Sequence, residues 1–146
     1  ANSCAAGLAV LDEIERLVVR FADCSLPCAE WTHGAHLTVG LWHAWRYPAN
    51  EALDRVRTGI LRYNVACNVP TTPVRGYHET ITRLYMLLID RYLTTATDRT
   101  DLLALTNELL ATHGDRDLPL TYYTRQRLFS AEARADWVPP DLRPLP

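Results

Sequence analysis

The sequence predicts an all-α protein, a single-domain bundle of five to six helices over residues 1–146 with an extended, proline-rich C-terminal tail. Three observations support this fold class. Apolar residues recur at helical spacing, no segment alternates as a strand does, and proline or glycine separates the periodic segments. The chain has 146 residues, of which 48% are hydrophobic, so it is long enough to bury one core.

The first two helices are predicted at residues 5–23 and 27–46. Pro27 suits the first turn of the second helix, and Pro48 ends it, because the residue before a proline disfavours the helical conformation. This second helix is apolar on most sides, so we expect it to lie at the centre of the bundle.

The remaining helices are predicted at residues 51–63, about 76–95, 101–113 and 121–134. Asn50 is the expected cap of the first of these, and Gly114 ends the third. The connection from 64 to 76 is longer than usual, and such loops are often functional. Residues 137–146 contain four prolines and cannot be helical, so we expect a tail that packs on the bundle through Trp137 and Leu142.

Composition narrows the range of partners and locations. The net charge is -2, which argues against nucleic-acid binding, and no apolar run is long enough to cross a membrane. All 15 basic residues are arginine, as in proteins from GC-rich bacterial genomes. Without a recognisable secretory signal, the four cysteines (Cys4, Cys24, Cys28 and Cys67) are expected to be reduced thiols, and the protein to be cytoplasmic.

A cluster of histidines is the main candidate for a functional site. Glu30, His33, His36 and His43 fall on one broad face of the predicted helix 27–46, beside the small residues Ala29, Gly40 and Ala44. Imidazole is the commonest metal ligand in proteins, and two rings one turn apart can share an ion. Buried, hydrogen-bonded core histidines are the alternative interpretation.

A second polar stretch, from Tyr77 to Arg83, is the expected partner of this face. His78 is predicted to point inward, so His33, His36 and His78 would hold a divalent metal with an open position. Zn, Fe, Ni and Cu all accept such ligands. Glu79 would pair with Arg83 at i,i+4, or Arg83 would clamp a substrate anion while Tyr77 orients the substrate.

Three stretches carry a resemblance to known proteins: Glu30 to Leu37, Pro73 to Arg83, and Trp137 to Leu145. In these the chain resembles a family of small bacterial all-helical proteins that are usually described as hypothetical. The resemblance implies that the three stretches belong to one architecture, and it implies no activity.

The leading hypothesis is a small bacterial metal-dependent enzyme that acts on a small molecule, in hydrolytic, lyase or oxygen chemistry, in a secondary-metabolism setting. Glu30 or Glu79 would be a further ligand or the general base. A metal-free enzyme with a histidine acid or base, and a non-catalytic binding module, are the alternatives. The side of the central helix that carries Trp31, Trp42 and Trp45 could face the core or a second subunit, so a homodimer is left open.

Overall fold

The computed structural model describes residues 13–146, and within that range the protein is all-helical, as predicted. A helix at residues 13–22 precedes η1 (Cys28–Glu30), α2 (His33–Arg46), α3 (Ala49–Ala66), α4 (Glu79–Thr95), α5 (Leu102–His113), η2 (Leu118–Thr121), α6 (Arg125–Leu128) and α7 (Ala131–Ala135). The only β pairing in this range is an isolated bridge between Thr72 and Arg75. Residues 5–12 of the first predicted helix lie outside the described range. No helix between residues 13 and 146 is long and apolar enough to cross a membrane.

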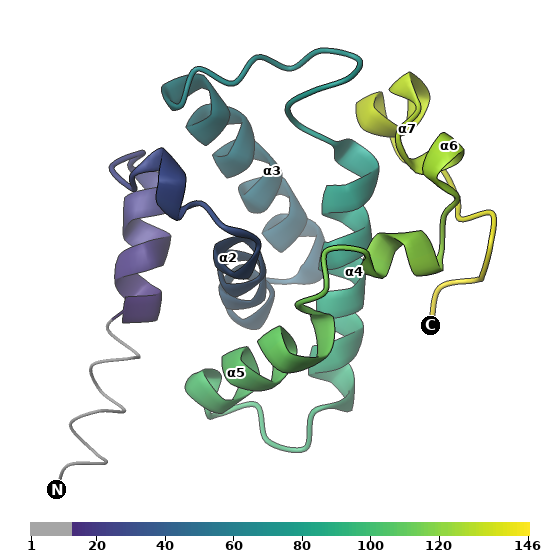
Figure 1. Ribbon diagram of the computed structural model, residues 1–146. Helices are drawn as coiled ribbons and strands as arrows, with labels where there is room; N and C mark the ends of the chain where they lie inside the picture. The colour runs from purple at the N-terminus through teal and green to yellow at the C-terminus, as the bar shows by residue number, and fades with distance from the viewer. Residues whose placement is uncertain (1–12) are drawn as a thin grey trace, which may run out of the picture.

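Helix α2 is central, as its apolar surface predicts. It contacts α3, α4 and α5 (Figure 1). The side chains of Leu37 and Leu41 are almost completely buried. Gly40 faces α4, where a Cβ atom at this position would lie 3.0 Å from Ile89 Cδ1 and 3.3 Å from Met86 Sδ. The missing side chain therefore allows α2 and α4 to approach each other closely.

The predicted start of α2 is wrong by six residues. Pro27 precedes the short 3₁₀ helix η1, and α2 begins only after Thr32, whose side chain accepts a hydrogen bond from the backbone N–H of Ala35. A threonine in this position satisfies one of the free N–H groups of a helix start. Glu30 consequently belongs to η1 and does not share a helix with the histidines.

Two more helix starts differ from the prediction. Helix α3 begins at Ala49 after the extended Pro48, so Asn50 lies inside the helix and is not its cap. Helix α4 begins at Glu79, and His78 is its cap: the His78 ring accepts a hydrogen bond from the N–H of Ile81. His78 is therefore not on a helical face with Thr82 and Tyr85.

The C-terminal part packs against α4. The expected helix 121–134 is split into α6 and α7, because Thr124 and Ser130 each cap a new start. Residues 137–146 contain no helix; Val138 is buried and its carbonyl accepts a hydrogen bond from the Tyr123 hydroxyl at 2.6 Å. Of the two expected anchors, Trp137 is half-buried and lies edge-on to Tyr123, with ring centroids 6.4 Å apart. Leu142 is 57% exposed, so Val138 fills its role.

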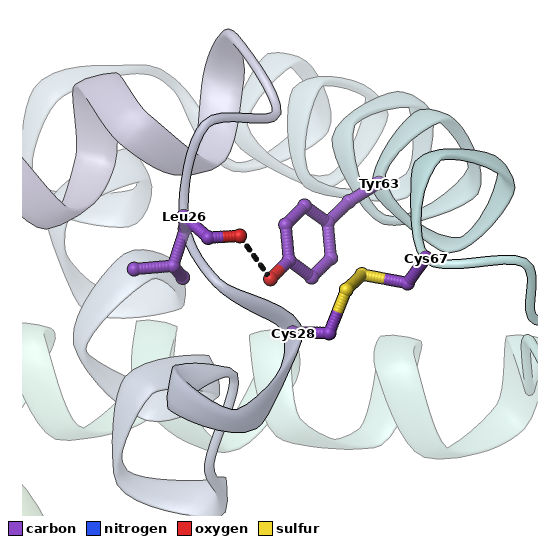
Figure 2. The surroundings of a disulfide bond; sticks show 4 residues. All are labelled: Leu26, Cys28, Tyr63 and Cys67. Atoms are coloured by element: carbon purple, nitrogen blue, oxygen red, sulfur yellow. Dashed lines mark hydrogen bonds between the residues drawn. A yellow bond between two sulfur atoms is a disulfide. The ribbon is translucent and has the colours of Figure 1, made fainter.

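Cys28 and Cys67 form a disulfide that joins η1 to the C-terminal end of α3. Their Cα atoms are 5.9 Å apart although 39 residues separate them along the chain. Beside this bond the Tyr63 hydroxyl donates a 2.8 Å hydrogen bond to the carbonyl of Leu26 (Figure 2). The prediction of reduced thiols is wrong for this pair, because the fold brings together cysteines whose spacing gives no sign of it. Cys24 is unpaired.

Candidate functional site

A cavity of about 370 Å³ lies between α2, α3 and α4, and we refer to it as the α2–α4 cavity. Its wall is mainly apolar, with side chains that include Leu37, Val56, Ile60, Ile81, Met86 and Ile89. Trp31, His33, His36, Thr82, Tyr85 and Arg116 add its polar and aromatic groups. A mainly apolar cavity of this volume with a few polar groups is typical of small-molecule sites.

His33, the first residue of α2, lines this cavity and has an unsatisfied nitrogen. Its Nε2 atom is buried and has no hydrogen-bond partner within residues 13–146. Burial lowers the pKa of His33, and the backbone of His113 partly opposes that shift. The ring is therefore neutral at pH 7.

Tyr85, on α4, is the second unsatisfied group in the same wall. Its hydroxyl is buried without a partner among the described residues, and its ring centroid lies 5.4 Å from that of His33 in an edge-on arrangement. Burial raises the pKa of Tyr85 to about 12, so the hydroxyl keeps its proton. A buried polar group without a partner costs roughly 1–3 kcal/mol. Two of them in one cavity wall point to a partner beyond the described residues.

His36 lies one turn after His33 and packs against Trp31 at a tilt of 33°, with ring centroids 3.9 Å apart. Its Nδ1 is 2.7 Å from the carbonyl of Thr32 and donates to it, which leaves Nε2 with a free lone pair. His36 is an exposed residue, and its side chain also forms part of the cavity wall. Burial lowers the pKa of His36, and water that reaches the ring limits the size of that shift. His36 is thus also neutral at pH 7.

Among the described residues of the cavity wall, only Arg116 brings a full positive charge, from the connection after α5. It makes no ion pair with any residue that the structure describes, and its charge lowers the pKa of both His33 and His36. The sequence analysis missed it. No motif marks Arg116, and only the packing of α5 against α2 brings it to the site.

No family model, no curated protein and no solved structure matches the chain. The resemblance to a bacterial helical family therefore stays a prediction, and the functional argument depends on the site itself.

The structure does not bring His78 to the other two predicted metal ligands. Its Nδ1 accepts from the Ile81 N–H at 3.1 Å, and its Nε2 lies 2.6 Å from the carbonyl of Leu128, to which it donates. Both ring nitrogens are therefore used in capping α4 and holding α6. Between residues 13 and 146 no three histidine, cysteine or acidic side chains are grouped so as to hold a metal. The predicted ligand set thus reduces to His33 and His36.

Hydrogen bonds from neighbouring side chains hold the Glu79 carboxylate in place. Arg57 of α3 binds both carboxylate oxygens, at 2.8 and 2.6 Å, and the Tyr77 hydroxyl donates to one of them at 2.7 Å. The hydrogen bonds from Arg57 are the main cause that lowers the pKa of Glu79. Arg83, the partner expected from spacing, is only at 4.0 Å. Arg57 was missed, because 22 residues separate it from Glu79.

The other two predicted site residues also lie away from the α2–α4 cavity. Glu30 is exposed and lies 3.7 Å from Arg20. The Arg83 guanidinium lies 5.3 Å from the centroid of the Trp137 ring, near Asp136. Of the seven predicted site residues, the cavity therefore contains His33 and His36, whereas Tyr85, Trp31 and Arg116 complete it.

Proposed function

We propose that this protein binds a small, mainly apolar molecule in the α2–α4 cavity. The observation that carries the proposal is the pair of buried polar atoms, His33 Nε2 and Tyr85 OH, that have no hydrogen-bond partner among the described residues. Proteins satisfy nearly all their buried polar groups, so each exception needs an explanation. A bound molecule supplies one, since both side chains line the same cavity.

Metal-free acid–base catalysis is the enzymatic version of this proposal. A neutral imidazole in an apolar cavity is a competent proton acceptor, and His33 and His36 both fit that description. The reaction and the substrate depend on the ligand, whose class is argued below.

A divalent metal, Zn, Fe, Ni or Cu, is a second candidate, now limited to His33 and His36. In both rings Nε2 has no partner among the described residues, and the carbonyl of Thr32 orients His36, as in many metal-binding histidines. Elemental analysis of untagged protein purified without chelator tests it. About one metal per chain, lost in both His33→Ala and His36→Ala, would support a metal enzyme; a metal-free wild type would contradict it.

Cytoplasmic location and a homodimer both stay predictions. The disulfide between Cys28 and Cys67 weighs against the first, because such bonds persist mainly in oxidising compartments. Titration of free thiols, in protein isolated from its native host and denatured at once, distinguishes the disulfide from two reduced cysteines at Cys28 and Cys67.

Propylbenzene is a suitable first probe, because it tests the apolar wall alone. We expect calorimetric titration to show one site per chain. Binding should be lost in Gly40→Leu, where the new side chain would occupy the space beside Met86 and Ile89, and weakened in His36→Trp. His36→Trp changes an accessible side chain, so it provides a test even if Gly40→Leu does not fold. Binding that neither folded variant alters would contradict the proposal.

A further inference from the structure

The hydrogen-bonding capacity of the α2–α4 cavity specifies the kind of polar group that its ligand carries, and this inference rests on the proposed binding function. The relevant atoms are His33 Nε2, Tyr85 OH, His36 Nε2 and the Arg116 guanidinium, which all belong to residues of the cavity wall.

His33 offers an acceptor. The ring is neutral, so only one nitrogen carries a proton, and the backbone of His113 favours the charged ring, as a carbonyl beside a ring N–H does. Since Nε2 has no partner, this N–H is Nδ1–H, and Nε2 keeps a lone pair. His36 has the same arrangement, because its Nδ1–H donates to Thr32.

Tyr85 offers a donor. Its hydroxyl stays protonated, and no backbone or side-chain acceptor in residues 13–146 takes that proton. A group that satisfies both Tyr85 and His33 must therefore accept one hydrogen bond and donate another.

We propose that the ligand is an alcohol or phenol whose hydroxyl donates to His33 Nε2 and accepts from Tyr85 OH, with its apolar body against the α2, α3 and α4 side chains. A carboxylate has only acceptors and would leave both imidazole lone pairs unsatisfied. An ammonium group has only donors and would meet the positive charge of Arg116. A hydroxyl is the simplest group that satisfies both buried atoms, His33 Nε2 and Tyr85 OH.

The test compares three probes of nearly the same shape by calorimetric titration. 4-Propylphenol donates and accepts, 4-propylanisole only accepts, and 4-propylbenzoate is an accepting anion. We expect the phenol to bind at least tenfold more tightly than either of the others. The preference over anisole should fall below about threefold in His33→Phe and in Tyr85→Phe. Tyr92→Phe is the matched control, because the Tyr92 hydroxyl bonds to Leu105 outside the cavity, and it should keep the full preference.

Each other outcome refutes a distinct statement. Equal binding of all three probes would overturn the hydroxyl proposal and leave the binding function intact. If the benzoate binds most tightly, Arg116 forms an anion site and the hydroxyl proposal is wrong. A preference for the phenol over the anisole that is unchanged in both His33→Phe and Tyr85→Phe would also overturn the hydroxyl proposal. If propylbenzene and all three probes fail to bind wild-type protein, the binding function itself fails.

Discussion

Tyr85→Phe removes one oxygen atom from the wall of the α2–α4 cavity. The sign of its effect on stability shows whether the hydroxyl is available to a ligand or is bonded within the protein. Where a tyrosine hydroxyl makes a hydrogen bond within the folded protein, this substitution lowers the free energy of unfolding. The Tyr85 hydroxyl is buried and has no partner among the described residues, so we expect the opposite sign.

The magnitude follows from the penalty for an unsatisfied polar group. Burying such a group costs roughly 1–3 kcal/mol, and the shape of the ring is retained in phenylalanine. We therefore expect Tyr85→Phe to raise the free energy of unfolding by about 1 kcal/mol. For a chain of this size that corresponds to an increase in Tm of about 4 °C.

Tyr123→Phe is the matched control for this experiment. The Tyr123 side chain is fully buried and its hydroxyl donates to the carbonyl of Val138 at 2.6 Å. Its loss should lower the free energy of unfolding by about 1–2 kcal/mol, because the bond disappears and a buried carbonyl loses its partner. The two variants should thus differ by roughly 2–3 kcal/mol although the chemical change is identical.

Urea unfolding followed by circular dichroism measures both variants against the wild type. Equal m-values would show that the change lies in the stability of the folded state. If Tyr85→Phe were destabilised as much as Tyr123→Phe, its hydroxyl would have a partner within the protein, and the argument for a ligand at this position would fall.

Three further predictions concern groups outside the cavity. Replacing Cys28 and Cys67 together by serine should lower the free energy of unfolding by about 4 kcal/mol, the chain-entropy value for a loop of 39 residues, in urea titrations. Glu79→Gln should cost about 2 kcal/mol in the same assay, because Arg57 loses its charged partner. His78 should make unfolding pH-dependent. Its pKa is lowered by burial, so the unfolded chain binds more protons, and stability should fall as pH decreases from about 6.5 through the pKa of the folded state.

Control substitutions distinguish these effects from a general sensitivity of the fold to any substitution. Cys24→Ser changes a thiol that is free within residues 13–146, and it should have a much smaller effect than the double replacement. Glu51→Gln removes an exposed i,i+4 pair with Arg55 and should change stability by less than about 0.5 kcal/mol. A loss as large as that of Glu79→Gln would contradict the structural role given to Glu79. For His78, an unfolding free energy that is flat between pH 7 and pH 5 would contradict the capping role of the neutral ring.

The sequence predicted the helices well because helical periodicity is a local signal. The central position of α2 followed from apolar residues around its whole circumference, and the structure confirms it. Helix starts were harder to predict. Thr32 and His78 cap helices through side-chain hydrogen bonds to an N–H three residues on, and the competing signals of Pro27 and Gly76 led to starts that were too early.

The candidate site was predicted only where its residues share one helix. His33 and His36 lie in the cavity, because their spacing keeps them on one side of α2. Arg116 enters from a connection far along the chain, and Arg57 reaches Glu79 from another helix. Contacts between residues of different segments depend on how the helices pack, and residue spacing within one segment cannot predict them.

The bond between Cys28 and Cys67 also gives the molecule a covalent topology. It closes a ring of chain that includes all of α2 and α3 and excludes α4. A single backbone cut at the junction between these two helices, beside Pro48, leaves the pieces joined through sulfur, whereas a cut in residues 68–78 separates them. Nicking by a protease would thus release fragments of non-reduced protein only from outside the ring.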